Sequence, residues 1–433
     1  MIFNVTSGGG SGQLKSAIIV TAPTGSTVTA TSGGTVKNAA EKNGVWTFQR
    51  LDLGAWTITA TKGGETATQT INITAINVYR VTLAYVRIYG IQRDITNSSP
   101  AWARTDSAVG KTATATVGTV AGHSDFSDCY PWSGIKRETL STGDVMVKIP
   151  KFWYRRYRSG NVEYIKIADK ATSGFTLHPA FNHGGVAKDY LYVGAYKTTS
   201  GNKSISGSSP LVNQTRATMC SNARAKGTGW GIIDIAALSA IQMLILVEFA
   251  NNNVQSVIGR GYCDGNGSAL RTGTCNNVSG LTGRPAGTDG KVDVVWRGVE
   301  GLWGNVWEWI DGVNWNDGTY YVCNDPPKYA DDTTTNYTAL SFKGATNWAS
   351  SYITQEGLDT GSNPHVMLPS AAGSGSETTY DCDACWSSTG WCVFQHGGRW
   401  ASGSECGLFA VPLNLNSSSF SASTGSRLLY IPA

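Results

Sequence analysis

The sequence predicts an α+β protein in which strands dominate, and three observations lead to that prediction. Glycine accounts for 52 of 433 residues, hydrophobic residues for 41% and charged residues for only 15%. Such a chain is too apolar for disorder and too rich in small polar residues for a helical protein. Residues 17–84 alternate apolar and polar side chains in short runs, whereas two stretches near 215–226 and 234–250 show helical spacing.

Residues 1–84 are expected to form a small all-β sandwich. Runs such as "STVTATS" (26–32) and "GVWTFQRL" (44–51) alternate in polarity, and glycine-rich turn signals separate them. This rhythm is typical of antiparallel strands with one buried face. The stretch resembles the immunoglobulin-like or prealbumin-like modules found in phage tail fibres, which implies that it is a spacer.

Residues 85–144 are irregular and are expected to be a connecting or adaptor segment. The next stretch, "VMVKIPKFWYRRYR" (145–158), interleaves five cations with four aromatic rings. Such a pattern occurs in platforms for single-stranded nucleic acid, and it also occurs in a strand whose cations reach past an apolar face to solvent. We favour the strand, because the net charge of +4 is small for this length and nucleic-acid surfaces need clustered cations.

Two helices are predicted in the middle of the chain. The first lies near 215–226 and ends before Gly227, a residue type that suits the end of a helix. The second begins at Asp234, a natural N-cap, and its broad apolar surface indicates burial on more than one side. The run 232–250 approaches the length of a membrane span, but Asp234, Gln242 and Glu248 interrupt it. We therefore expect a buried helix and no membrane insertion.

The stretch "EGLWGNVWEW" (300–309) combines large rings with residues that permit tight turns. The tryptophans are expected to be core wedges, the glycines to permit close backbone approach, and the polar side chains to satisfy buried groups. Glu308 is interpreted as a structural acceptor in preference to a catalytic carboxylate. The predicted structural core motif consists of Gly301, Trp303, Gly304, Asn305, Trp307, Glu308 and Trp309.

"GLWGNVWEW" resembles the signature of the formylglycine-generating-enzyme type of C-type lectin fold. With the helix upstream and "GGRW" (397–400) downstream, the resemblance covers residues 145–433. It implies a C-type lectin fold for this ligand-binding domain. Because proteins with different functions share such a fold, the fold alone does not establish the function.

The enzymatic branch of that family implies a copper-binding cysteine pair after the GG dipeptide. Here "GGRWASGSECGLF" (397–409) offers only Cys406, with Ser402 near the expected position of a partner. The five histidines show no paired spacing for iron. Cys382 and Cys385, with Cys392 and Cys406 nearby, leave a zinc site, a disulfide and free thiols open. No catalytic residue, metal or cofactor is predicted.

Residues 391–428 resemble the variable region of proteins diversified by a retroelement. The matching features are the GG dipeptide, "LFAVPLNLN" (408–416) and "GSRL" (425–428), whereas Ser426 and Pro412 depart from the pattern. The resemblance implies a hypervariable surface on a core that does not depend on it. The candidate ligand-binding residues, chosen by alternation and loop placement, are Phe394, His396, Arg399, Ala401, Ser402, Glu405, Val411, Phe420, Ala422 and Ser423.

These resemblances imply a non-catalytic receptor-binding protein of a phage or prophage tail, diversified by a diversity-generating retroelement. The expected location is the virion, at the tail tip or fibre, after assembly in the cytoplasm of the bacterial host. The expected partners are a bacterial cell-surface protein or glycan, other tail proteins through the N-terminal region, and further copies of the chain in a homotrimer. The alternatives are a copper-dependent oxidoreductase of the formylglycine-generating type and a dedicated glycan-binding lectin.

Overall fold

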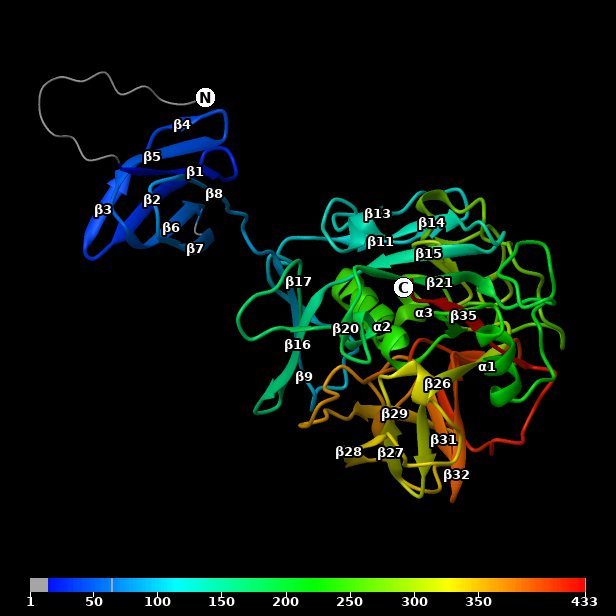
Figure 1. The fold of residues 1–433 in the computed structure, drawn as a ribbon. Coiled ribbons are helices and arrows are strands. Elements are labelled where there is room, and N and C mark those ends of the chain that lie inside the picture. The colour runs from blue at the N-terminus through cyan, green and yellow to red at the C-terminus, as the bar shows by residue number, and fades with distance from the viewer. Residues whose placement is uncertain (1–14, 64, 433) are drawn as a thin grey trace, which may run out of the picture. The chain divides into compact units, whose positions relative to one another are not determined.

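The computed structural model describes residues 15–63 and 65–432 (Figure 1). The chain forms two compact units, Met1–Arg87 and Ile88–Ala433. Residues 1–14 of the predicted first domain lie outside the described residues. Residues 88–144, most of the predicted connector 85–144, belong to the second unit, where β9 (Ile88–Asp94) pairs along its length with β17 (Val162–Ala168).

The first unit is a sandwich of two four-stranded sheets, in the orders β4-β5-β1-β8 and β3-β2-β6-β7. Its strands are β1 (Ser16–Thr21), β2 (Thr27–Ser32), β3 (Thr35–Asn38), β4 (Glu41–Lys42), β5 (Val45–Leu51), β6 (Gly54–Lys62), β7 (Glu65–Ile73) and β8 (Val78–Thr82). Alternate residues of β1, β2, β5 and β6 point into one core that contains Trp46 and Trp56. The predicted alternation therefore marks the buried face correctly, and the immunoglobulin-like assignment stays a prediction.

The second unit is built from small sheets around the buried helix α2 (Ile235–Phe249). Its four main sheets run β10-β9-β17-β16-β18, β14-β15-β21-β35-β22, β28-β27-β26-β32 with β34 beside β26, and β30-β29-β31-β33. The strands of the first two are β10 (Ala103–Asp106), β14 (Lys136–Thr139), β15 (Val145–Pro150), β16 (Trp153–Ser159), β18 (Thr176–Leu177), β21 (Tyr190–Lys197), β22 (Trp230–Ile232) and β35 (Arg427–Tyr430). Those of the other two are β26 (Trp307–Asn316), β27 (Thr319–Val322), β28 (Thr338–Lys343), β29 (Ser351–Glu356), β30 (Pro369–Gly373), β31 (Ala384–Ser387), β32 (Trp391–His396), β33 (Val411–Leu413) and β34 (Thr424–Gly425).

Short elements complete this unit. The remaining strands are β11 (Ala113–Thr114), β12 (Thr116–Val117), β13 (His123–Ser124), β19 (Asn182–His183), β20 (Val186–Ala187), β23 (Gly283–Arg284), β24 (Val295–Trp296) and β25 (Val299–Glu300). The helices are α1 (Arg216–Arg224), α2 (Ile235–Phe249) and α3 (Val254–Val257), with 3-10 turns η1 (Trp132–Gly134), η2 (Pro179–Phe181), η3 (Ser279–Leu281), η4 (Pro326–Lys328) and η5 (Gly403–Glu405).

The predicted α+β class is wrong. About 41% of the residues are in strands and 10% in helices, so the protein is mostly β. The two predicted helices exist, but each is short, and the surrounding chain is divided into many small sheets instead of one sheet with a helical layer. The glycine-rich composition indicates this outcome better than the helical spacing does, because frequent turns keep strands short.

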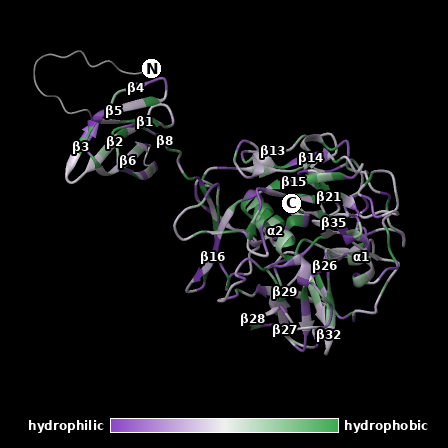
Figure 2. Ribbon diagram, in the orientation of Figure 1, coloured by the Kyte–Doolittle hydropathy of each residue, from purple (hydrophilic) through white to green (hydrophobic). Residues whose placement is uncertain are grey.

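Helix α2 lies at the centre of the second unit, where Figure 2 shows it as a hydrophobic segment. The predicted N-cap is confirmed, since a side-chain oxygen of Asp234 accepts a hydrogen bond from the amide of Ala237 at 2.8 Å. All fifteen residues of the helix are buried. Its charged Glu248 is tolerated because Arg297 pairs with it at 2.6 Å and the indole of Trp296 donates to it at 2.9 Å. None of the described helices is long and apolar enough to cross a membrane.

The cation-rich stretch 145–158 forms two strands, β15 and β16, where the sequence predicts one long strand with its cations reaching solvent. Two of its cations serve the interior: Arg156 is buried and bonds to Glu163 at 2.7 Å, and Arg158 reaches the same carboxylate at 3.3 Å. Lys151 pairs with Asp189 at 2.7 Å. These arginines are therefore committed to ion pairs within the fold.

Candidate ligand-binding face

The 301–309 motif is a tight turn that leads into β26. Gly301, Gly304 and Asn305 have positive φ angles of 63°, 80° and 66°, a backbone region that favours glycine and tolerates asparagine. A Cβ on Gly304 would lie 2.8 Å from the amide nitrogen of Tyr262. Glycine is therefore required there by both conformation and space.

The tryptophan rings of the motif brace it against other parts of the second unit. Trp303 and Trp309 are fully buried, and their indole N–H groups donate to the carbonyl oxygens of Gly259 at 3.1 Å and Gln214 at 3.0 Å. The ring of Trp307 packs edge-on against Trp386, with centroids 5.7 Å apart. Each ring thus joins segments that are distant in sequence.

Glu308 belongs to a buried ion cluster that joins three strands. Its Oε1 accepts from Arg427 Nη2 of β35 at 2.6 Å and from Lys197 Nζ of β21 at 3.0 Å, and all three side chains are at most 2% exposed. Burial by itself would raise the pKa of Glu308, but the attraction of Arg427 and Lys197 outweighs it and lowers that pKa. The carboxylate therefore acts as a structural counter-ion.

Glu300, just before the motif, is expected to make the stability of the protein depend on pH. Its carboxylate accepts backbone N–H bonds from Gly273 and Cys275 at 2.6 and 2.8 Å. Burial, and then repulsion by Asp293, raise its pKa from 4.5 to about 7. A carboxyl whose pKa is raised by folding favours the native state below its unfolded pKa, and this stability is lost as the pH rises through the folded pKa.

We therefore expect Glu300→Gln, which cannot ionise, to gain stability relative to the wild type between pH 5 and pH 8. The expected relative gain is on the order of 1–3 kcal/mol. Urea unfolding of both proteins at the two pH values measures it. Parallel stability curves would show that Glu300 does not titrate as described.

The loop 397–405 is held to the motif by its main chain. The amide of Trp400 donates to the carbonyl oxygen of Asn305 at 3.0 Å, and the carbonyl oxygen of Trp400 accepts from Gly265 at 2.6 Å. The Asn305 side chain in turn bonds both the amide and the carbonyl of Leu270, at 2.9 and 3.2 Å. These contacts do not depend on which side chains the loop carries at positions 399 and 401.

The loop 416–423 is held in the same way. The carbonyl oxygen of Ser423 accepts from the amide of Trp307 at 2.9 Å, and that of Ser421 accepts from the amide of Asn213 at 2.9 Å. The anchors of the two loops, Asn305 and Trp307, are two residues apart. The Cα atoms of two such residues are at most about 7 Å apart. The anchored residues of the two loops, Trp400 and Ser423, are therefore held at neighbouring positions of the motif.

The exposed side chains of these loops define what we call the C-terminal face. The ring of Phe420 is 65% exposed. Ser402 and Glu405 also have local roles, because the Ser402 hydroxyl accepts from the Arg399 amide at 3.0 Å and Glu405 bonds to the Ser350 hydroxyl. The face consists of the exposed Arg399, Ala401, Phe420 and Ala422 and the partly exposed Ser402 and Glu405.

Four of the predicted ligand-binding residues are buried, and for these the prediction needs correction. Phe394 is 1% exposed, His396 0%, Val411 2% and Ser423 7%. The alternation rule fails in β32 because both of its faces are covered: Val393 and Phe394, on opposite faces, enter two different core clusters. The Nε2–H of His396 donates to the carbonyl oxygen of Leu408 at 2.7 Å. None of the four can meet a ligand that arrives from solvent.

Sequence reasoning missed the residues that support the face from other segments. Tyr352 contacts Ser404 through their hydroxyl groups at 2.8 Å, the amide of Asn213 donates to the carbonyl oxygen of Ser421, and Trp386 packs on Trp307. These residues lie far from the loops in sequence, so local pattern carries no signal for them.

Cys406, the one thiol after the GG dipeptide, has a partner that the sequence did not reveal. Its sulfur lies in hydrogen-bonding contact with the thiol of Cys263, and both residues are 0% exposed. Its thiol also donates to the carbonyl oxygen of Gly397 at 2.9 Å, and burial raises the pKa of Cys406 well above its usual range. A substrate thiol cannot reach this pair. All nine cysteines are buried free thiols, which includes the four whose state was left open.

Comparisons with known proteins give distant likenesses to solved structures. No protein-family model matches the chain. No curated protein matches it either. Among solved structures it is similar to three proteins titled Major Tropism Determinant: the U1 variant at 13% identity and a TM-score of 0.27, and the P3c and M1 variants, each at 12% identity and 0.26. The alignments cover 87–88% of this chain and 80–82% of theirs. At such TM-scores the likeness carries no argument about function.

Proposed function

We propose that this chain is a non-catalytic receptor-binding protein of a phage or prophage tail. It binds a bacterial cell-surface protein or glycan through the C-terminal face. The observation that carries the proposal is that loops 397–405 and 416–423 are anchored by main-chain hydrogen bonds while their side chains at 399, 401, 420 and 422 reach solvent.

This arrangement suits a surface that must accept many different side chains. A backbone amide or carbonyl makes the same hydrogen bond whichever residue carries it, so substitutions at the face leave the anchors intact. The motif beneath is stabilised by buried rings and an ion cluster that do not involve the face. The exposed residues also suit recognition, because aromatic and arginine side chains dominate binding energy and small polar residues adapt around them.

In this proposal the protein works as a homotrimer in the virion, at the tail tip or fibre, and is assembled in the cytoplasm of the bacterial host. The N-terminal unit contacts other tail proteins. Three copies of a weak site would bind a cell surface with high avidity. Light scattering of the purified protein tests the oligomer and should give a mass of three times 45.9 kDa.

The binding test replaces Arg399 and Phe420 by alanine in the full chain. We expect attachment to susceptible cells in a panel of bacterial strains to fall by about tenfold or more, because central aromatic and arginine contacts carry most of an interface's energy. Fluorescently labelled protein and flow cytometry measure the attachment. The melting temperature should be unchanged.

Val120→Ala is the matched control, since Val120 is 70% exposed and lies outside the face. It should leave attachment unchanged. Equal attachment by the double variant and the wild type would contradict the proposal. Attachment that is lost on enzymatic removal of surface glycans, but not on proteolysis of the cells, would identify a glycan receptor and so support the lectin-like form of the proposal.

Diversification by a retroelement is tested by the neighbouring DNA. It should contain a reverse-transcriptase gene and a near-copy of the segment that encodes residues 391–428. The two copies should differ almost only at adenines of the template, and the affected codons should be those of the exposed face. Substitutions spread over the buried codons, such as that of Phe394, would contradict this part of the proposal.

A further inference from the structure

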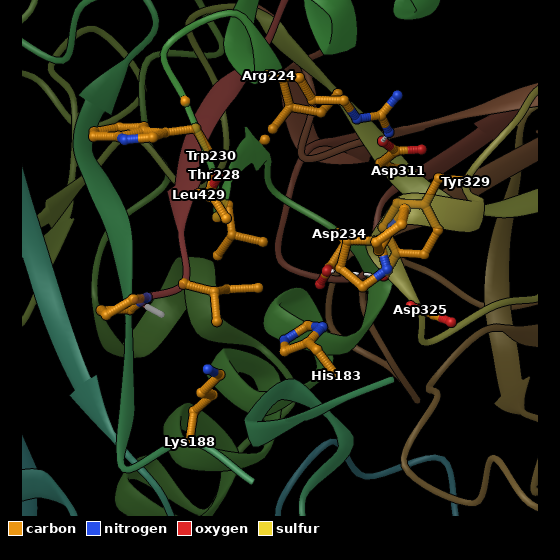
Figure 3. Close-up of a pocket in the computed structure, with 18 of the residues that line it drawn as sticks. His183, Lys188, Arg224, Thr228, Trp230, Asp234, Asp311, Asp325, Tyr329 and Leu429 are labelled. Atoms are coloured by element: carbon orange, nitrogen blue, oxygen red, sulfur yellow. Dashed lines mark hydrogen bonds and ion pairs between the residues drawn. The ribbon is translucent and has the colours of Figure 1, made fainter. Parts of the chain in front are cut away.

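A cavity of about 660 Å³ lies in the second unit (Figure 3). The charges that line it are already balanced within the fold. Asp311 pairs with Arg224 at 2.6 Å, and Asp325 pairs with Lys328 at 2.8 Å. The third carboxylate, that of Asp234, is 0% exposed. No described carboxylate of the cavity is therefore left to select a charged ligand, and we assign none to it.

The thiols of Cys263 and Cys406, by contrast, meet in a way that allows a chemical step. Both residues are 0% exposed, and their sulfur atoms lie in hydrogen-bonding contact. The main chain holds them together, since the amide of Gly403 donates to the carbonyl oxygen of Cys263 at 3.0 Å. A disulfide needs a sulfur–sulfur distance of about 2.05 Å, so the two thiols need only a small approach to form one.

The GG dipeptide provides the space that the Cys406 sulfur occupies. A Cβ on Gly398 would lie 2.5 Å from that sulfur, so a larger residue there would displace it. Gly397, Gly398 and Gly403 have positive φ angles of 95°, 98° and 59°, which glycine adopts without strain. The loop 397–405 can therefore turn back and hold Cys406 against Cys263.

The two thiols differ in their tendency to ionise. Contact with Cys406 lowers the pKa of Cys263, and the guanidinium of Arg260 lowers it further. These two effects outweigh burial and the nearby Asp264, which act in the opposite direction. Burial, and then the contact with Cys263, raise the pKa of Cys406 well above its usual range. Cys263 is therefore the thiol of the pair that ionises first, and the thiolate is the form that reacts with oxidants.

Most of the other cysteines lack this activation. Burial raises the pKa of six of them, which keeps them as unreactive thiols. These are Cys220, Cys275, Cys323, Cys382, Cys385 and Cys392. Oxidation should therefore begin at Cys263.

The Cys263 sulfur is close to solvent although it is buried. The guanidinium of Arg260 lies against it, and the side chain of Arg260 is 32% exposed and pairs with Asp264 at 3.1 Å. A molecule the size of water needs only a shift of this partly exposed side chain to reach the sulfur. A thiol carried on another protein is too large for that path.

We propose that Cys263 and Cys406 form a redox modification site, which a peroxide converts into a disulfide. The Cys263 thiolate attacks one peroxide oxygen, so that an S–O bond forms, the O–O bond breaks and hydroxide leaves to take up a proton. The Cys406 sulfur then attacks the Cys263 sulfur, the S–S bond forms, and the S–O bond breaks to release water with the proton of Cys406. Two thiols are oxidised, and one hydrogen peroxide is reduced to two waters.

The disulfide fastens the loop 397–405, which carries Arg399 and Ala401, to the chain around Cys263. It links residues more than 100 positions apart, and a crosslink over such a span strongly restricts the unfolded chain. The site does not depend on what the C-terminal face binds. Either proposal can therefore fail without the other.

Treatment of the purified full-length protein with hydrogen peroxide tests the proposal. We expect the number of free thiols, counted after denaturation, to fall from nine to seven. Mass spectrometry of peptides should find Cys263 joined to Cys406. The melting temperature should rise by about 5 °C, and dithiothreitol should restore both the thiols and the original melting temperature.

Two variants identify the residues responsible. Cys406→Ser keeps a donor for the carbonyl oxygen of Gly397 but cannot form the bond, and after peroxide it should show no crosslink and no rise in melting temperature. Cys129→Ser is the matched control, since Cys129 is 9% exposed and its thiol donates to the carbonyl oxygen of Asp125 at 3.3 Å. This variant should still lose two thiols. Melting curves before oxidation show that each variant is folded.

Three outcomes in the wild type would overturn the proposal. Retention of all nine thiols would show that peroxide does not reach the pair. A crosslink between other cysteines, such as Cys382 and Cys385, would place the reactive site elsewhere. Addition of oxygen to Cys263 without a crosslink would show that Cys406 does not meet it in solution.

Discussion

Glu308→Ala is expected to destabilise the second unit by about 3–5 kcal/mol, the usual cost of removing one partner from a buried ion pair. The substitution leaves the guanidinium of Arg427 and the ammonium of Lys197 buried without their shared counter-ion. The substitution also removes the ion pairs that connect β26 to β21 and β35. Urea unfolding followed by tryptophan fluorescence measures the loss.

The pH dependence of this contribution has a defined sign. Because folding lowers the pKa of Glu308, its stabilisation is present above the unfolded pKa of about 4.3 and is lost as the pH falls through the folded value. The stability difference between the wild type and Glu308→Gln should therefore narrow below about pH 4.

Glu377→Ala is the matched control, since Glu377 is exposed, and it should change stability by less than about 0.5 kcal/mol. A Glu308→Ala protein of unchanged stability that no longer attaches to cells would contradict the structural role. The carboxylate would then act on a ligand, as the catalytic interpretation of the motif requires.

The second large effect separates two phenylalanines that sequence pattern placed on the same face. Phe394→Ala is expected to cost about 3–5 kcal/mol, as large-to-small substitutions in a packed core do, because Phe394 is 1% exposed. Phe420→Ala should change stability by less than about 0.5 kcal/mol, because Phe420 is 65% exposed. Chemical unfolding of the two variants in parallel measures the difference.

Phe394→Leu serves as the conservative control, and it should recover most of the stability lost in Phe394→Ala. Attachment to cells gives the complementary readout, with Phe420→Ala impaired and Phe394→Leu unaffected. Equal stability losses for the two alanine variants would show that Phe420 is packed in solution, which would remove it from the C-terminal face.

Much of the local structure could be predicted from the sequence. The alternation in 17–84 gives the buried side of the sandwich strands, and Asp234 marks the start of α2 correctly, because these features depend on neighbours within a few residues. The 301–309 motif likewise reveals its turn, since positive φ angles favour glycine and asparagine. The class was wrong because helical spacing shows that helices exist and does not show how small the sheets around them are.

The candidate face could be predicted only in part. Loop composition identified Arg399 and Phe420 as exposed, since a loop residue has solvent on most sides. Alternation then failed for Phe394 and His396, because the period-2 rule assumes one solvent face and β32 is covered on both. The cavity of about 660 Å³ lined by His183 and Trp230 left no local signal in the sequence, because its lining comes from segments spread between residues 183 and 432.

The sequence by itself determined the short-range features of this protein: its turns, its helix caps and the apolar residues that a core needs. Those depend on backbone sterics and on nearest neighbours along the chain. Only the tertiary structure decided that Cys406 meets Cys263, that Glu308 pairs with Lys197 and Arg427, and that both sides of β32 are covered. The two members of each of these pairs are more than 100 positions apart in the chain. The free energy that brings them together comes from the burial of side chains when the whole second unit folds.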